Sequence, residues 1–315
     1  MEPHPSDSVI TTGSVASSLG NFTLHFPADY PVEVETYLRE LTVDVTLALV
    51  SRFGPVEPAP FQLMIVDSRA QLEKWVGGKL PTWIHAVARE HPPMVVVLGP
   101  ATEVAEPISH RFEQILLHEL THVYLYRLYP SRNGERLPGW FHEGLAVHVS
   151  GGLDRGLHQA LVRGRLTGRF YTLDQLDRIY HTSSVLSELA YAQSVVAVQT
   201  MEDFYGQGVF RSLFDEIRGG LPFPAAFAQI GGEPLEEFQA RYQAALRRRY
   251  NILLVLADPG VLFILLPLLL LTAYLIKLWR NRAIAARWAA EDIGGGDRPG
   301  NLAPPDDNHQ VNGWE

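Results

Sequence analysis

The chain has 315 residues, which is enough for one large or two small domains with a proper hydrophobic core. Its formal net charge of -9, and the lack of a basic stripe with interleaved aromatics, argue against a nucleic-acid surface and predict no nucleic-acid partner. Because the chain contains no cysteine, a disulfide scaffold and a thiolate metal site are excluded.

The N-terminal third of the chain predicts a mixture of strands and helices. Residues 1–20 are mostly polar, and we expect them to form a flexible segment without a signal peptide. The elements predicted next are a strand at 22–26, a helix at 32–53, a strand at 61–66, a short helix capped by Ser68 and ending near Val76, and a strand at 94–98.

Residues 111–130 contain an H-E-x-x-H motif on a predicted helix that Pro130 ends. His118 and His122 are four residues apart, so both imidazoles can point at one zinc ion. Glu119 lies one step round the helix and can reach a water on that metal, as a general base must. Two surface histidines without a metal are the alternative, but burying these groups among apolar neighbours would be costly without one.

A catalytic zinc site needs three protein ligands and a water. A polar turn at 131–139 leads to a second helical stretch at 140–149, which glycines 151 and 152 end. Glu143 lies near the start of this stretch and can swing back to complete a His-His-Glu site. The alternative is that Glu143 is an ordinary surface carboxylate.

These two motifs together resemble the peptidase MA-like (gluzincin) family of zinc metallopeptidases. The resemblance rests on His-Glu-Leu-Thr-His at 118–122 and Trp-Phe-His-Glu-Gly-Leu-Ala at 140–146, and it extends over about 21–249. It implies an α+β fold, with a zincin-like metallopeptidase domain at 21–250 made of a small sheet, active-site helices and a helical C-terminal lobe. It also implies that Zn²⁺ is the cofactor, with His118, His122 and Glu143 as metal ligands and Glu119 as a catalytic residue.

The resemblance suggests two further features of the site. Many gluzincins use a tyrosine to donate a hydrogen bond to the oxyanion, and Tyr191 is the candidate catalytic residue, with Tyr180 and His181 in reserve. The alternative for Tyr191 is an aromatic that only packs. Gluzincins also present a sheet edge that pairs with extended substrate, and the strand at 94–98 is either this edge or a buried core strand.

One position departs from the family pattern. Thermolysin-like gluzincins carry an Asp four residues after the ligand Glu, where it holds a ligand histidine, and Val147 stands there in this chain. His142 and His148 lie nearby, but a fourth protein ligand would close a catalytic site. We therefore expect both to be incidental or outer-shell residues.

The C-terminal half is predicted to be helical and to end in a membrane segment. Helices are expected at 153–166, 173–180, 186–205, 209–217, 222–230 and 234–250. Residues 260–279 are apolar enough for one transmembrane helix, with Tyr274 and Trp279 suited to the interface. Residues 280–315 form a basic flank and, from 291, a disordered tail. Four basic residues stand on each side of the span, so charge does not fix its orientation.

The sequence thus predicts a single-pass membrane-anchored zinc metallopeptidase that hydrolyses peptide bonds by a zinc-activated water. Its partners would be a peptide or protein substrate and, through the C-terminal helix, the lipid membrane. Family habit favours an extracytoplasmic peptidase domain. Two alternatives remain open: an inactive zinc-fold binding module, and a zinc hydrolase of a non-peptide amide.

Overall fold

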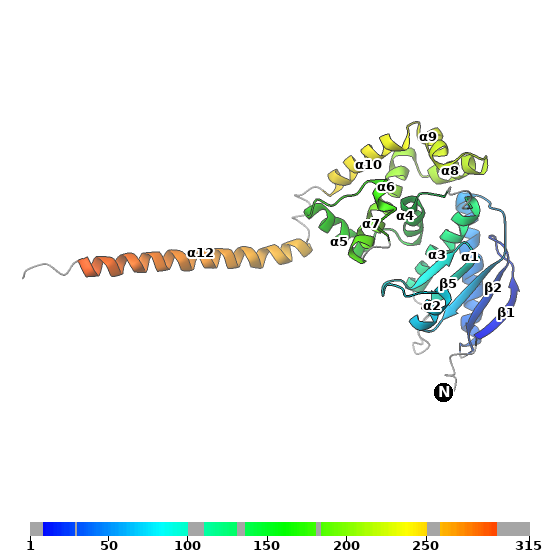
Figure 1. The fold of residues 1–315 in the computed structure, drawn as a ribbon, viewed down its shortest axis with the longest axis horizontal. Coiled ribbons are helices and arrows are strands. Elements are labelled where there is room, and N and C mark those ends of the chain that lie inside the picture. The colour runs from blue at the N-terminus through cyan, green and yellow to red at the C-terminus, as the bar shows by residue number, and fades with distance from the viewer. Residues whose placement is uncertain are drawn as a thin grey trace, which may run out of the picture. The chain divides into compact units, whose positions relative to one another are not determined.

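The computed structural model describes residues 9–28, 30–99, 110–130, 136–180, 184–250 and 259–294. The chain divides into two units, Met1–Val255 and Leu256–Glu315. The first unit combines one sheet with many helices, and the second contains one long helix (Figure 1). The predicted α+β class with a small sheet and a helical C-terminal lobe is confirmed.

The sheet of the first unit has five strands in the order β1-β2-β3-β5-β4. They are β1 (Val9–Val15), β2 (Phe22–Pro27), β3 (Phe61–Val66), β4 (Ala86–Arg89) and β5 (Met94–Leu98). The three central strands β2, β3 and β5 run parallel, while β1 and β4 pair antiparallel at the two edges. A continuous apolar sequence in β5 fits this central position, since both of its faces are covered.

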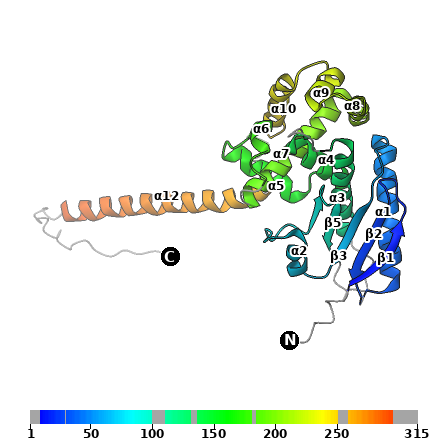
Figure 2. The ribbon, with the colours of Figure 1, turned by 45° about the vertical axis from the view of Figure 1, so that its right-hand side comes forward.

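Helices cover both faces of this sheet (Figures 1 and 2). α2 (Arg69–Val76) packs through buried Leu72 on the face formed by Met64, Val66 and Val96. On the opposite face α1 (Val32–Phe53) and α3 (His110–Leu128) lie side by side, and α3 contacts β4 and β5. The motif-bearing helix is therefore placed directly against the edge of the sheet.

The helical lobe follows α3 in the chain. Its helices are α4 (Gly139–Ser150), α5 (Arg155–Leu166), α6 (Leu173–Leu176), α7 (Ser184–Tyr205), α8 (Val209–Arg218), α9 (Phe223–Gly231) and α10 (Leu235–Arg249). A large aromatic cluster fills this lobe, with Trp140, Phe141, Phe223 and Phe238 all fully buried. These rings fix α4, which carries Glu143, against the later helices.

The structure differs from the sequence prediction at the two edges of the sheet. Residues 9–15, expected within a flexible segment, form β1 and pair with β2; residues 1–8 lie outside the described part. The strand at 94–98 is the buried core strand of the two alternatives, because β4 pairs with its outer side. β4 has only four residues, which are too few to show the alternation of apolar and polar residues that predicts a strand.

α4 and α7 approach each other closely at Gly144. A Cβ atom added there would lie 2.5 Å from the carbonyl oxygen of Ser194, so only glycine permits this packing. We expect Gly144→Ala to destabilise the chain by about 1–3 kcal/mol, because overpacking forces the backbones apart. Thermal unfolding would measure this loss, and Gly78→Ala, where an added Cβ meets nothing within 4 Å, is the matched control. Equal melting temperatures for the two variants would contradict the close packing.

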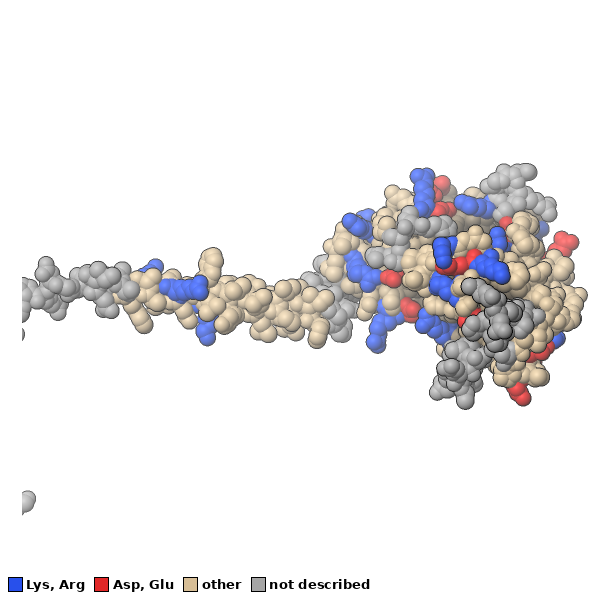
Figure 3. All heavy atoms as spheres, turned by 60° about the horizontal axis from the view of Figure 1, so that its bottom comes forward, with Lys and Arg blue, Asp and Glu red and all other residues tan. Residues whose placement is uncertain are grey.

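The second unit contains α12 (Pro259–Gly294), with Pro267 inside it. Leu262–Trp288 is the one stretch of the described residues that is long and apolar enough to cross a membrane, and none of it is buried against protein. In Figure 3 the first half of this helix shows no charged side chain, and blue spheres appear on its second half. The helix runs past the predicted end at 279 and includes 291–294 of the expected disordered tail; 295–315 lie outside the described residues.

Candidate metal centre

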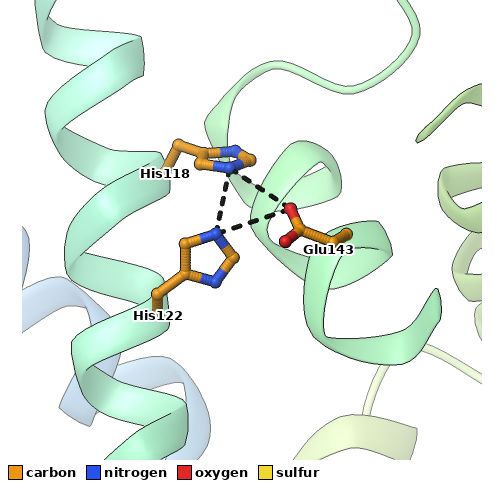
Figure 4. A group of neighbouring side chains, drawn as sticks. All are labelled: His118, His122 and Glu143. Carbon is orange, nitrogen blue, oxygen red and sulfur yellow. Dashed lines mark hydrogen bonds and ion pairs between the residues drawn. The ribbon is translucent and has the colours of Figure 1, made fainter. Parts of the chain in front are cut away.

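Two helices bring the three candidate ligands together. His118 and His122 lie one turn apart on α3, and Glu143 lies in the second turn of α4. The side chains of all three point into the space between the helices (Figure 4). The structure thus brings together the three residues that the sequence analysis proposed as metal ligands.

The distances between the ligand atoms are short. The two histidine Nε2 atoms lie 3.1 Å apart, and Oε2 of Glu143 lies 3.7 Å from His118 Nε2 and 3.5 Å from His122 Nε2. Two ligands of a tetrahedral zinc with bonds of about 2.0–2.2 Å stand about 3.3–3.6 Å apart. Two imidazole nitrogens and a carboxylate oxygen are also the donor set of His₂Glu zinc sites. Both the donor types and their spacing therefore fit zinc.

The charges within this cluster are strongly coupled. Burial disfavours the ionised form of Glu143, but the nearby His122, together with His118, holds the pKa of Glu143 well below its ordinary value. Burial likewise lowers the pKa of His122, and the neighbouring Glu143 carboxylate outweighs this and raises it. The cluster thus presents an anionic oxygen beside two imidazoles, which is a suitable arrangement for a divalent cation.

Glu119 is buried beside the cluster and contacts the edge of the sheet. Its side chain is 7% exposed, and it accepts a hydrogen bond from the backbone N–H of Ala88 in β4. Burial raises the pKa of Glu119, and His118 and His122 oppose this shift. A carboxylate with a raised pKa is better matched to accept a proton near neutral pH.

His142 and His148, the two histidines of α4, are not part of the ligand cluster. The ring of His142 stacks on that of His122, with centroids 4.5 Å apart and an interplanar angle of 6°. Burial, followed by the nearby His122, lowers the pKa of His142 to about 3, so its ring is neutral. His148 Nε2 lies 3.2 Å from Oε2 of Glu202, near the C-terminal end of α4. Neither residue belongs to the group of ligand atoms that converge within the described part of the chain.

Val147 lines the cleft where the family pattern has a carboxylate. Consistent with this, His122 Nδ1 is buried and has no hydrogen-bond partner within the described part of the chain. The ring of His142 lies stacked against the His122 ring. On its Nδ1 side the His122 ring is therefore held by packing against His142 and not by a hydrogen bond.

Tyrosines surround the site. Tyr191 lines the same cleft as the cluster. The nearby carboxylate of Glu143, then burial and Glu119, raise its pKa. Tyr180 packs against Tyr191, and its hydroxyl is already hydrogen-bonded to Ser194. His181, the other reserve residue, lies outside the described residues.

Tyr126 is a site residue that the sequence analysis missed. It lies four residues after His122 on the same face of α3, and its ring is 5.0 Å from that of His142. Burial raises its pKa, and the carboxylates of Glu143 and Glu119 raise it further. The i, i+4 spacing from His118 through His122 would have identified it.

A cleft of about 1220 Å³ runs past the cluster. One wall is the segment between α2 and β4, including Leu80, Trp83 and Ile84. Arg69 on α2 holds this wall by donating to four of its carbonyl oxygens, those of Leu80, Pro81, Thr82 and Ile84. No sequence pattern indicates such an anchor, because an Arg on a short polar helix ordinarily faces solvent.

Residues 57–248 match the model of a family described as the Peptidase MA superfamily. No match was found among the curated proteins. Solved structures similar to the chain include a Deinococcus radiodurans M1 zinc metallopeptidase E323A mutant bound to a Tyr-Ser-Ala substrate. It is 15% identical, with a TM-score of 0.41, and the match covers 75% of this chain and 51% of that one.

Two further structures are similar at the same level. An aminopeptidase N family protein from Idiomarina loihiensis is 12% identical, with a TM-score of 0.45, over 74% of this chain and 46% of that one. Legionella pneumophila aminopeptidase A bound to aspartic acid is 14% identical, with a TM-score of 0.42, over 75% and 27%. This chain spans about half the length of the first structures that it matches, or less.

Proposed function

The chain belongs to the peptidase MA superfamily, as its two motifs indicated, and from this premise we propose that it is a zinc metallopeptidase that hydrolyses peptide bonds. The observation that carries the proposal is the convergence of His118, His122 and Glu143, whose ligand atoms all lie within 4.8 Å of one another. We assign these three residues as the metal ligands. Three protein ligands leave one position of a tetrahedral zinc open, as catalysis requires.

Zinc held there would lower the pKa of a water ligand towards about 7 and polarise the scissile carbonyl. Glu119 is the general base in this proposal: it takes a proton from the attacking water and passes it to the leaving amine. Its burial and its contact with Ala88 hold the carboxylate in one place for both transfers. Tyr191 is the candidate donor to the developing oxyanion, since its hydroxyl lies near Glu143 and Glu119.

The outer edge of β4 is the proposed position of the substrate main chain. Among the described residues this strand pairs with β5 alone, and its Ala88 N–H points to Glu119. An extended peptide can add to such an edge by main-chain hydrogen bonds, which brings its carbonyl groups past the base. The strand at 94–98 no longer fills this role, because β4 covers it.

The test is to measure the zinc content of the purified full-length chain and its cleavage of a mixed peptide library. One zinc per chain with cleavage supports the proposal. Zinc without turnover of any peptide would favour a binding module, for which the absence of a hydrogen-bonding residue at Val147 leaves room. Turnover confined to non-peptide amides would favour a zinc hydrolase of such amides.

Removal of the metal should destabilise the chain as well as inactivate it. A ligand that binds only the folded state at 100 times its Kd stabilises that state by about 2.7 kcal/mol. We therefore expect a chelator to lower the melting temperature and added Zn²⁺ to restore it. Mg²⁺, which prefers oxygen ligands, is the control ion and should restore nothing. A melting temperature that neither the chelator nor added zinc changes would contradict stabilisation of the fold by the metal.

We also propose that α12 anchors the peptidase domain in a membrane as a single-pass helix. Its length and apolar surface support this, and Tyr274 and Trp279 suit an interface. The domain, proposed at 21–250 and extended by β1 to Val9, is assigned to the extracytoplasmic side on the habit of the family alone.

Membrane fractionation tests the anchor. The full-length chain should resist extraction by carbonate and require detergent, whereas a chain ending after Tyr250 should remain in the supernatant. Replacing Leu268 and Leu271 by arginine is a control that keeps the length, because each charge in the middle of a span costs about 2.5–3.5 kcal/mol. Equal distribution of all three chains would exclude the helix as an anchor.

A further inference from the structure

The helix that carries Glu143 begins without a cap of its own. Pro138 precedes α4 and provides no side-chain hydrogen bond, while its carbonyl oxygen accepts from the N–H groups of Phe141 and His142. The first N–H groups of a helix otherwise lack partners. Here Asp177, 37 residues after Trp140, supplies one: its Oδ1 accepts from the N–H of Trp140 at 2.8 Å, and its carboxylate also accepts from the N–H of Gly139.

Asp177 is itself held firmly. It directly follows α6, a single turn fixed by a capping box between Thr172 and Gln175 and by two buried leucines, Leu173 and Leu176. The N–H of Leu173 donates to Gln239 of α10, which ties this turn to the rest of the lobe. The carboxylate therefore stands at a fixed point against which α4 can be placed.

The first turn of α4 controls the position of Glu143. Trp140 and Glu143 are three residues apart, so they lie one above the other on the same side of the helix. Gly144 presses the next turn against α7, and the buried Trp140 ring packs in the aromatic cluster. The contact at Gly144 fixes one point of α4, and a pivot of the helix about that point would move Glu143. The packing of the Trp140 ring and the hydrogen bonds to Asp177 together oppose such a pivot.

We propose that Asp177 is a positioning residue for the metal ligand Glu143, and that it tightens metal binding by fixing the N-terminus of α4. The inference rests on the proposed function, because it requires the cluster to bind zinc. Glu143 must keep one oxygen within reach of both histidines, at 3.7 and 3.5 Å in this structure, so a small tilt acts directly on the donor set. Partners that orient ligands in this way typically change metal affinity by about 10–100-fold.

The experiment measures zinc affinity of the full-length chain by competition with a chromophoric chelator, and the visible spectrum of the Co²⁺ form. We expect Asp177→Ala to weaken zinc binding by about tenfold and to alter the Co²⁺ bands. Asp177→Asn should restore both, since its amide oxygen can accept from the same N–H groups. The matched control is Asp154→Ala, because Asp154 caps α5 through the N–H of Leu157, also at 2.8 Å, and α5 carries no ligand.

The outcomes separate the two proposals. If the wild-type chain binds no zinc, the proposed function fails, and this inference fails with it. If the wild type binds zinc and Asp177→Ala binds it equally well, or Asp154→Ala weakens it to the same extent, only the positioning role fails. Should Asp177→Ala not fold by circular dichroism, Asp177→Glu takes its place: the longer side chain displaces the cap, and we expect weaker binding than for Asp177→Asn. Equal affinities for these two would overturn the inference.

Discussion

Glu119→Gln should bind zinc as tightly as the wild type and lose at least about 10²–10⁴-fold in the rate of peptide hydrolysis, the usual contribution of a general base. The amide has nearly the shape of the carboxylate but cannot accept a proton. Glu119 is outside the ligand cluster and points to the N–H of Ala88, so its replacement leaves the three metal-binding atoms in place.

Zinc content and initial rates, measured on the same preparation, check this expectation. Glu113→Gln is the control on the same helix: Glu113 is hydrogen-bonded to Tyr37, away from the cluster, and its loss should leave the rate unchanged. Full turnover in Glu119→Gln would refute the proposed mechanism even if zinc were present. Loss of zinc in that variant would instead mean that Glu119 takes part in metal binding.

His118→Ala should lose both zinc and activity. It removes one of three ligands, so the loss of affinity should exceed the roughly 10–100-fold that replacement of an outer partner costs. Removal of the ring should cost little folding stability, because the His118 side chain is 22% exposed and lies at the cleft. The apo fold should therefore persist, which chelator competition and circular dichroism together would establish.

His148→Ala is the matched control for that variant. This histidine also lies on an active-site helix and near a carboxylate, Glu202, but it offers no atom to the cluster. Its replacement should leave zinc content unchanged. If instead His118→Ala retained one tightly bound zinc per chain, the ligand assignment would be wrong from its first residue.

The sequence indicated the residues at the centre of the proposed site but not the residues that support them. His118, Glu119 and His122 follow from spacing on one helix, since a helix fixes which side chains share a face, whereas the role of Glu143 follows from the family resemblance. Asp177 and Arg69 act through contacts with backbone groups far away in the chain, at 37 residues for Trp140 and 11–15 for the cleft wall. Any residue type can supply a backbone N–H or C=O group, so no sequence motif identifies the partners of Asp177 and Arg69.

The same reasoning explains the errors at the sheet. A helix makes its hydrogen bonds within itself, and 32–53 was predicted with the bounds that the structure gives α1. A strand depends on its neighbours, so β1 and β4 became strands only through β2 and β5. The sequence of β1 is polar and that of β4 is very short, as is common in edge strands. Whether such a segment forms a strand depends on the strand that it pairs with.

The length of α12 has a consequence for how far its basic residues stand from a bilayer. Thirty-six residues at about 1.5 Å each give a rod of about 54 Å, whereas a hydrocarbon core is about 30 Å thick. If the uncharged first half spans that core, about 24 Å of continuous helix projects beyond it. Lys277 would then lie at the edge of the core, and the projecting part would carry Arg280, Arg282 and Arg287, first at the level of the phosphates and then in water, on a rigid helix rather than a flexible chain.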